Sequence, residues 1–554
     1  MENKRMNYKQ EFNRWLSEPV VDESTKDELM NLTDGEIEDR FYRDLEFGTG
    51  GLRGIMGAGT NRMNVYTVRR ATQGLSEYVR SNGDTAINAG VVIAYDSRNN
   101  SSKFAKECAS VLSANKIKSY MFDSLSPTPE LSFAVRELGC FAGIVITASH
   151  NPKEYNGYKV YGKDGGQLPP FDAKQVLDFI LATDIFEDVK VCENPDTVLL
   201  GKELEDKYIA AVLAQSLGIP IEKDLKIVYT PLHGTGNLPV RRVLGEIGVK
   251  ELYIVKEQEA PDGNFPTVIS PNPENISAFD IAKRQAEMLG ADLIIATDPD
   301  SDRVGIMARD SDGSYLALDG NQTGALLADL IFEKMEKAGM PKNPRLIKTI
   351  VTTELARKIA ESYGVTCIDV LTGFKYIGDK IKEYETSGEH FIFGLEESYG
   401  YLKGTYARDK DAVVASMLIA ELASECKRLG TTIPERLCSL YEKHGYHKEK
   451  LLSYTLKGID GTRKIDKIMA QIRALPPLAG EVKRVDYSQG IDGLPPSNVV
   501  KIFFNNGWLC ARPSGTEPKI KFYTSASCPS SAESDAALNA LSSFIEGIVG
   551  KFID

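Results

Sequence analysis

Apolar and polar residues alternate along the chain in blocks that predict strands followed by helices. Residues 89–98, AGVVIAYDSR, are typical of a buried strand that ends in polar residues. Residues 128–139, TPELSFAVRELG, have an apolar stripe at helical spacing, with Thr128 as a cap and Pro129 at the first helical position. The apolar strand 144–146 follows directly. This order of elements predicts a βαβ unit with a parallel or mixed sheet.

The same pattern returns in two further rounds. In the second round we expect a strand and polar loop at 225–236, a helix at 238–247, a strand at 251–255, a helix at about 275–289 and a strand with an acidic end at 291–303. The third round covers 345–364, 365–381, 390–401 and a long helix at about 411–429. The tail instead predicts short strands, including VVKIFFNN and KIKFYTSAS, between helices at about 461–475 and 530–550.

These elements predict an α/β protein of four domains: three α/β domains with mixed sheets between helices, then a smaller α+β C-terminal domain. We expect boundaries that give domains 1–204, 205–312, 313–444 and 445–554. Ligands of such sheets bind beyond the carboxyl ends of the strands. The polar motifs all follow predicted strands, so we expect one shared cleft between the domains.

The composition limits which classes of protein and which partners fit the chain. A chain of 554 residues with 42% apolar and 26% charged residues is typical of a multidomain globular enzyme or binding protein. The net charge of −12 disfavours nucleic acid as a partner. We expect no membrane span, because no apolar run approaches ~18 residues. The eight scattered cysteines indicate reduced thiols, which is typical of a cytoplasmic protein. We also expect no signal peptide, because the amino terminus lacks the apolar core of one.

The segment TDPDSDR places three carboxylates at alternate positions. On an extended backbone, Asp298, Asp300 and Asp302 would converge on one point, where their repulsion requires a cation. A calcium EF-hand is excluded because Arg303 and Arg309 stand where that loop needs Gly and Glu. Hard oxygen donors in small number suit Mg²⁺, which completes its shell with phosphate and water. The alternative is a solvated acidic turn.

Two further motifs could hold a phosphorylated sugar. In ARPSGTEPKIKFY, an arginine fork, two hydroxyls and a glycine turn suit a phosphate group, namely Arg512, Ser514, Gly515 and Thr516. In GLEESYGY, a carboxylate and a hydroxyl two residues apart, Glu396 and Ser398, suit vicinal sugar hydroxyls. A plain Pro-Gly turn and a charged strand end are the alternatives. The Gly-rich segment around Arg53 lacks the Lys-Ser/Thr of a nucleotide-binding loop.

The apolar strand 144–146 leads into Thr147-Ala148-Ser149-His150-Asn151-Pro152. Either this is a polar turn, or Ser149 is placed there to react. A hydrolase nucleophile elbow would have the pattern GxSxG, which is absent here. A phosphorylated Ser149 would supply the phosphate oxygens that a three-carboxylate magnesium site needs.

Four motifs in this order resemble the α-D-phosphohexomutase superfamily: TASHNPKEYNGYK as phosphoserine loop, DPDSDR as metal loop, GLEESYG as sugar loop and RPSGTEPK as phosphate loop. The resemblance covers nearly the whole chain. Its length and the segments LTGFKYIG and ARDKDAV are similar to the longer, phosphoglucomutase-like branch. The resemblance implies four domains around a central cleft, the last one a mobile lid.

The resemblance also implies a reaction: glucose 1-phosphate and glucose 6-phosphate interconvert through phosphorylated Ser149 and a bound glucose 1,6-bisphosphate. Mg²⁺ would bind Ser149, Asp298, Asp300 and Asp302. Lys159 and His150 compete as general acid/base, with Arg53 as a further catalytic candidate. The substrate would contact Arg303, Lys375, Glu396, Ser398, Arg512, Ser514, Gly515 and Thr516. Mannose or pentose phosphates are alternative substrates, and the protein would be a monomer or homodimer.

Two other classes of protein compete with a mutase. A haloacid-dehalogenase-type phosphatase would use Asp298 as nucleophile and Asp300 as acid/base. Asp302, however, stands where that group has Thr or Val, and Ser149 is left without a role. A non-catalytic sugar-phosphate sensor is disfavoured because Ser149, the three aspartates and Lys159 are all present.

Overall fold

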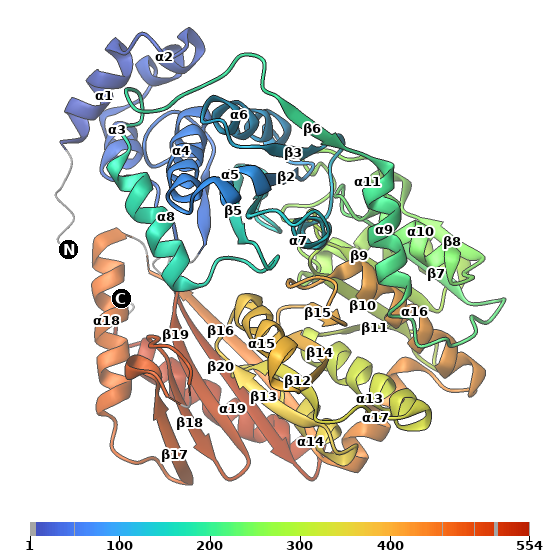
Figure 1. Cartoon of the computed structure of the whole chain (residues 1–554). Helices are drawn as coiled ribbons and strands as arrows, with labels where there is room; N and C mark the ends of the chain where they lie inside the picture. The colour runs from blue at the N-terminus through green and yellow to red at the C-terminus, as the bar shows by residue number, and fades with distance from the viewer. Residues whose placement is uncertain (1–6, 49, 457, 492, 515–518, 553–554) are drawn as a thin grey trace.

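The computed structural model describes residues 7–552 except 49, 457, 492 and 515–518. Four sheets follow one another along the chain (Figure 1), in the predicted order of three mixed sheets and one C-terminal sheet. This confirms the predicted α/β class with its four domains. Within the described residues, no helix has both the length and the apolarity that a membrane crossing requires.

The first domain is built on a six-stranded sheet in the order β1-β5-β4-β2-β3-β6. Four of these strands are parallel, and β5 and β1 extend the sheet as antiparallel strands. Alternate residues face opposite sides: Ile93 and Ile144 pack in the core beneath α4, α6 and α8, whereas Val92 and Val145 face α7. The strands are β1 Gly51–Ile55, β2 Val91–Tyr95, β3 Ser119–Phe122, β4 Ala142–Ile146, β5 Tyr155–Gly162 and β6 Thr197–Leu200. The helices are α4 Val65–Ser81, α5 Asp84–Ala89, α6 Ser101–Ala114, α7 Thr128–Glu137 and α8 Pro170–Ala182.

Two details of this domain differ from the sequence prediction. Helix α7 was predicted with Thr128 as its cap, but Pro127 holds that position. The Thr128 hydroxyl instead donates to Asp300 Oδ2 at 3.0 Å, which joins the helix to the second domain. The Gly-rich segment around Arg53 is strand β1, which the sequence did not indicate because its pattern lacks apolar alternation.

Three short helices precede the first sheet: α1 Tyr8–Ser17, α2 Glu23–Met30 and α3 Asp34–Phe41. They are fixed by the buried side chain of Trp15, whose ring packs edge-on against Phe41, Tyr66 and Phe186. The N-terminal helices therefore pack against the beginning of α4 and against Phe186.

The second domain has the sheet order β11-β10-β9-β7-β8, with β7, β8 and β9 parallel. Its strands are β7 Lys226–Thr230, β8 Glu251–Ile254, β9 Leu293–Thr297, β10 Val304–Arg309 and β11 Tyr315–Leu318. Its helices are α9 Lys202–Leu213, α10 Asn237–Glu246, α11 Lys256–Glu259, the 3₁₀ turn η1 Ile276–Phe279 and α12 Asp280–Leu289. The fully buried strand β9 ends at Thr297, directly before the three aspartates.

The third domain has the sheet order β13-β12-β14-β15. Its strands are β12 Pro344–Thr349, β13 Thr366–Val370, β14 His390–Glu396 and β15 Gly400–Lys403. Its helices are α13 Gly320–Ala338, α14 Glu354–Ser362, α15 Phe374–Ser387, α16 Ala412–Arg428 and α17 Ile433–His444. Helices α13 and α16 belong to a single apolar core that also contains α7, α9 and α10, so the first three domains are packed together through one continuous interior.

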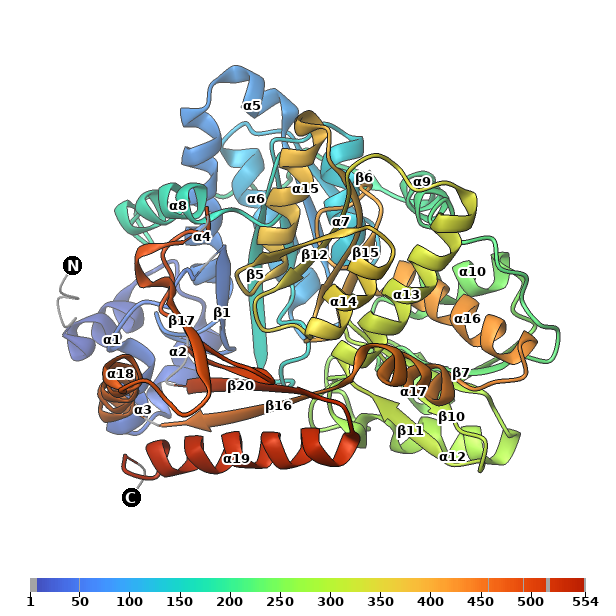
Figure 2. The same ribbon diagram turned by 90° about the horizontal axis from the view of Figure 1, so that it is seen from below.

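The C-terminal domain is an antiparallel sheet in the order β16-β20-β19-β18-β17. Its strands are β16 Tyr446–Thr455, β17 Glu481–Asp486, β18 Val500–Phe504, β19 Gly507–Pro513 and β20 Lys519–Cys528, with the turn η2 Tyr487–Gln489. Helices α18 Gly458–Ala474 and α19 Ser531–Val549 pack on one face; Figure 2 shows α19 lying along this face. The opposite face, with Trp508 and Tyr523, packs on Ile350, Val351 and Leu371 of the third domain.

The predicted strand KIKFYTSAS, residues 519–527, is β20, Lys519–Cys528. The ten-residue strand β16 was not among the strands that the sequence predicted. Only one side chain of β16 is buried and the others are partly or fully exposed, so its sequence lacks the apolar alternation that indicates a strand.

Candidate active site

A cleft of about 810 Å³ lies where the four domains meet, and each domain contributes to its lining, for example through Arg53, Ser270, Glu396 and Arg512. The predicted site residues that line it are Arg53, His150, Arg303, Lys375, Glu396, Ser398, Arg512 and Ser514. Ser149 and the three aspartates are at most 2% exposed. Two predicted residues, Gly515 and Thr516, lie outside the described residues.

Strand β4 delivers Ser149 to the site. After Ile146 the chain turns sharply, and Ser149 has φ 52°, a backbone conformation that is unfavourable for residues other than glycine. Its Oγ donates to Asp298 Oδ2 at 2.9 Å and lies 3.1 Å from Nδ1 of His150. The strand therefore leads to a strained serine whose hydroxyl touches the acidic loop of another domain.

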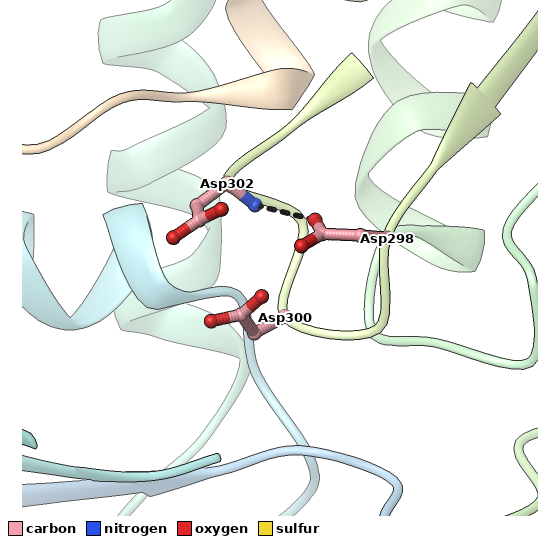
Figure 3. A group of neighbouring side chains, drawn as sticks. All are labelled: Asp298, Asp300 and Asp302. Carbon is pink, nitrogen blue, oxygen red and sulfur yellow. Dashed lines mark hydrogen bonds between the residues drawn. The ribbon is translucent and has the colours of Figure 1, made fainter. Parts of the chain in front are cut away.

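The three aspartates converge as predicted, but not on an extended backbone (Figure 3). They occupy a turn in which the Ser301 N–H donates to the Asp298 carbonyl at 3.0 Å and Ser301 has φ 52°. The Asp302 N–H donates to Asp298 Oδ1 at 3.1 Å. A tight turn, rather than strand alternation, brings the carboxylates together, because its backbone N–H groups point inward at Asp298.

One oxygen from each of the three carboxylates lies within 4.8 Å of the other two. Oδ1 of Asp300 and Oδ1 of Asp302 are buried and accept no hydrogen bond from any described residue, and Arg303 Nε lies 3.7 Å from Asp302 Oδ1 as an ion pair only. Buried carboxylate oxygens without a donor are unfavourable unless a cation binds them. The oxygen-only donor set therefore fits a hard divalent metal ion, with Ser149 beside it.

Two ammonium groups already neutralise part of this negative charge. Lys159 Nζ, on β5, donates to Asp300 Oδ2 at 2.9 Å and lies 3.5 Å from Asp302. Lys410 Nζ lies 2.9 Å from Asp302 Oδ2 and 3.2 Å from Asp409 Oδ1. Burial lowers the pKa of Lys159, but Asp300 and Asp302 outweigh it, so the pKa lies above its usual value.

Charges and burial also shift the pKa of the neighbouring groups. Burial and the charges of Asp300 and Asp302 raise the pKa of Asp298 well above its usual value. Burial and the cations Arg303 and Arg53 hold the pKa of His150 well below its ordinary value, so the imidazole is neutral.

The backbone of the serine loop is held by side chains from other segments. Ser270 Oγ of the second domain donates to the His150 carbonyl at 2.8 Å. Arg53 Nη1, from β1, donates to Asn151 Oδ1 at 3.2 Å. Arg53 thus brings a positive charge to the rim of the cleft beside His150.

Glu396 ends strand β14 and faces the cleft. It accepts a hydrogen bond from the Gly373 N–H at 3.0 Å. Burial raises its pKa to about 7, although Lys410 opposes the shift. Burial lowers the pKa of Lys375, which also lines the cleft, to about 8. Arg303 donates to Glu274 Oε1 at 2.5 Å.

The C-terminal domain supplies a second cationic end of the cleft. Arg512 and Ser514 lie at the end of β19, and Arg512 Nη1 donates to the Tyr523 hydroxyl at 3.4 Å. Lys519 and Lys521 of β20 line the same wall. Several cations and a hydroxyl on one wall suit a phosphate dianion.

Sequence reasoning missed Lys410 as a site residue. The residue stands in ARDKDAV directly before α16, and the structure shows its ammonium bound to the metal-loop carboxylate of Asp302. The signal was the charge run itself: Arg408, Asp409, Lys410 and Asp411 stand together and all are buried. Buried charges in a loop are rare without a partner or function.

A buried serine beside a carboxylate triad suited to a metal ion, together with a cationic wall from the C-terminal domain, is typical of an enzyme that handles phosphate groups. Comparison with known proteins identifies the family. Sequence models described as phosphoglucomutase/phosphomannomutase, alpha/beta/alpha domains I, II and III, match residues 44–185, 206–313 and 319–444, and the C-terminal domain of that family matches 461–539.

Two curated relatives are phosphoglucomutases of staphylococci. The protein from Staphylococcus aureus (strain MRSA252) is 38% identical over 92% of this chain and 94% of its own. The protein from Staphylococcus epidermidis (strain RP62A) is 39% identical over 93% of this chain and 96% of its own. The chain therefore belongs to the phosphoglucomutase/phosphomannomutase family, and it is an enzyme of the phosphotransferase-isomerase type.

Solved structures show the same fold at low identity. The phosphoglucomutase parafusin from Paramecium, in an open form, matches with a TM-score of 0.69 at 17% identity, over 92% of this chain and 96% of its own. A phosphoglucomutase/phosphomannomutase family protein from Burkholderia thailandensis matches with a TM-score of 0.68 at 19% identity, over 91% and 97%. The predicted superfamily is confirmed by the family models and the curated relatives, and these structures show that the fold agrees.

Proposed function

We propose that this enzyme interconverts glucose 1-phosphate and glucose 6-phosphate through a phosphorylated Ser149 and a bound glucose 1,6-bisphosphate. The observation that carries the proposal is the 2.9 Å hydrogen bond from Ser149 Oγ to Asp298, one of the three clustered carboxylates. The relatives at 38–39% identity support glucose as the sugar, because they are phosphoglucomutases over nearly their full length.

In the first transfer, the bond between phosphorus and Ser149 Oγ breaks and a bond from phosphorus to a sugar hydroxyl oxygen forms. The sugar hydroxyl loses its proton and Ser149 Oγ regains one. Lys159 and His150 are the two competing candidates for this proton movement: Lys159 carries a proton because Asp300 and Asp302 hold its pKa above its usual value, and His150 Nδ1 lies 3.1 Å from Ser149 Oγ. Arg53 adds positive charge near the transferring group.

We propose Mg²⁺ as the metal, held by Asp298, Asp300, Asp302 and an oxygen of phosphorylated Ser149. When bound, Mg²⁺ polarises the phosphoryl group and offsets its charge during in-line transfer. The fit rests on the two buried carboxylate oxygens that lack a hydrogen-bond donor.

The other end of the cleft must hold a phosphate that does not react. We assign Arg512, Ser514, Gly515 and Thr516 to this phosphate, and Glu396 and Ser398 to the sugar hydroxyls, with Arg303 and Lys375 as further contacts. The bisphosphate must bind in two orientations so that either phosphate can face Ser149. A cleft whose two ends come from different domains allows this exchange, because the sugar contacts lie between them.

We propose domain limits of 1–204, 205–312, 313–444 and 445–554. The change of sheet supports a boundary between β6, the last strand of the first sheet, and β7, which begins the second. Strand β11, Tyr315–Leu318, pairs with β10 of the second sheet, so the sheets place the next boundary after Leu318 and not at 312. We place the enzyme in the cytoplasm as a monomer or homodimer; the eight cysteines, all free, support a reducing compartment.

A coupled assay tests the proposal: glucose 1-phosphate, Mg²⁺ and catalytic glucose 1,6-bisphosphate are supplied, and glucose 6-phosphate is followed. We expect strong turnover by the wild type and none by Ser149→Ala. Mannose 1-phosphate and ribose 1-phosphate are run in parallel. Faster turnover of either would replace glucose as the substrate, and no turnover of any sugar phosphate would refute a mutase.

A further inference from the structure

The loop that carries Ser149 is bound by an arginine to which the proposed function gives no role. Arg98 follows strand β2 in the segment Asp96-Ser97-Arg98, and its side chain is fully buried. Its Nη1 donates to the carbonyl oxygens of Pro152 at 2.9 Å and Tyr155 at 3.1 Å. Its Nη2 donates to those of Ser149 and Asn151, both at 2.5 Å.

All four carbonyl groups belong to the seven residues from Ser149 to Tyr155. Residues 149–154 form neither a helix nor a strand, and Tyr155 is the first residue of β5, so the carbonyl groups of Ser149, Asn151 and Pro152 need partners from elsewhere. A planar guanidinium has five N–H donors in a fixed fork and can satisfy several acceptors at once. A lysine ammonium has only three donors and cannot reproduce this arrangement.

Asp96 links the Arg98 side chain to the backbone of Ser149 through Thr147. Its carboxylate lies 3.3 Å from Arg98 Nε and accepts from the Thr147 hydroxyl at 2.7 Å. Thr147 Oγ1 in turn accepts from the Ser149 N–H at 2.8 Å. Both peptide groups of Ser149 are therefore pinned: Thr147 binds its N–H, and Arg98 binds its carbonyl.

This pinning explains how Ser149 keeps a positive φ of 52°. Strained backbone conformations persist only where the surrounding structure over-determines them. The buried pair of Asp96 and Arg98 supplies that constraint, and the constraint places Ser149 Oγ against Asp298.

The second domain covers the guanidinium of Arg98. The ring of Phe265 stacks on Arg98 with 5.0 Å between the guanidinium carbon and the ring centroid. Gly263 lies so close to Asn99 that an added Cβ would be 2.3 Å from the Asn99 nitrogen. Arg98 thus lies between the serine loop and the domain that carries the three aspartates.

We propose that Arg98, with Asp96 and Thr147, is a positioning residue for phosphoryl transfer: it fixes the backbone of Ser149 so that Oγ faces the metal site. This inference rests on the proposed role of Ser149 as phosphoryl carrier. Arg98 is not among the residues that line the cleft, so its loss should impair the reaction and not sugar binding.

The decisive variant is Arg98→Lys, which keeps a positive charge beside Asp96 but removes the fork. We expect kcat to fall about 100-fold, the usual effect of a displacement near 1 Å, and KM to change less than 3-fold. Arg98→Gly should be inactive and regain activity with millimolar guanidinium, but not with urea, its uncharged analogue. The ³¹P resonance of phosphorylated Ser149 should shift or broaden in Arg98→Lys.

Arg436→Lys is the matched control. Arg436 is a partly buried arginine of α17 that pairs with Asp329 and Glu333 and is not among the residues that line the cleft. Its replacement should lower Tm while kcat stays within 2-fold of the wild type. Unchanged kcat in Arg98→Lys, or equal losses in both variants, would overturn the positioning role.

Thr147→Val keeps the shape of the buried Thr147 side chain but removes its hydrogen bonds, so it tests the positioning role even if the Arg98 variants do not fold. We expect a fall of about 10-fold in kcat with KM unchanged; an unchanged kcat would overturn the inference. The wild type measured beside it separates the two hypotheses. A wild type without turnover refutes the proposed function, whereas an active wild type with unimpaired variants refutes only the positioning role.

Discussion

Replacing Ser149 by glycine and by alanine measures the strain stored at this residue. Both variants lose the hydroxyl and its hydrogen bonds to Asp298 and His150, and neither can be phosphorylated. They differ in the positive φ of 52° at this position, which costs an L-residue roughly 1–2 kcal/mol and glycine little. Glycine, however, also lacks the buried methyl of alanine and loses more chain entropy, which together cost about 1–2 kcal/mol. The two effects offset each other, so we expect Ser149→Gly and Ser149→Ala to have similar stability.

The assay is scanning calorimetry of the two variants in the same buffer, with and without Mg²⁺. For the first domain, of roughly 200 residues, a difference of about 1 kcal/mol in the free energy of unfolding corresponds to roughly 2–4 °C in Tm. Ala148→Gly is the control at the neighbouring buried position, where φ is not positive. It should lose about 1–2 kcal/mol, since it deletes a buried methyl and adds chain entropy. A Ser149→Gly variant that is less stable than Ser149→Ala by that same amount of about 1–2 kcal/mol would refute the argument from strain.

Three further predictions concern the phosphate wall, a buried carboxylate and the metal. Arg512→Ala should raise KM for glucose 1-phosphate at least 10-fold while Ser149 still accepts a phosphoryl group, checked by steady-state kinetics and intact mass; an unchanged KM contradicts the assignment. Burial, and then the charges of Glu205, Asp411 and Asp123, raise the pKa of Glu130 to about 8. The folded state therefore keeps a proton that the unfolded state has lost, and the free energy of unfolding falls as pH rises from about 4.5 to 8. Glu130→Gln should remove up to about 4 kcal/mol of this loss between pH 5 and pH 8 in urea titrations, and parallel pH profiles would contradict it. Chelation with EDTA should abolish turnover and lower Tm, and Mg²⁺ should restore both; full activity after chelation would exclude a metal role.

The fold could be predicted because its parallel strands are buried on both faces. Strands such as β4 and β9 consist of continuous apolar residues, and the helices between them have apolar stripes at regular spacing. Strands β1 and β16 escaped prediction because glycine or solvent-exposed polar residues dominate them. Periodicity detects a strand only where burial selects the side chains.

The site was predicted only where its residues stand together in the sequence. Ser149 and the three aspartates were found because each motif is compact and carries unusual chemistry. Lys410 and Arg98 were not, because their partners are far away in the chain: Lys410 binds Asp302, and Arg98 binds the carbonyls of the serine loop. A run of charges such as residues 408–411 can indicate buried charged side chains, but it does not show which partner each one binds, and only the packed structure shows that partner.

A labelled-phosphoryl chase tests the central claim most directly. The enzyme is first phosphorylated with glucose 1,6-bisphosphate that carries ³²P, freed of excess ligand, and the labelled residue is mapped. Unlabelled glucose 1-phosphate is then added with Mg²⁺. The account predicts that the label lies on Ser149 and passes within a single turnover to glucose 1,6-bisphosphate. Label on an aspartate such as Asp298, or label that stays on Ser149 during turnover, would contradict a phosphoserine mutase.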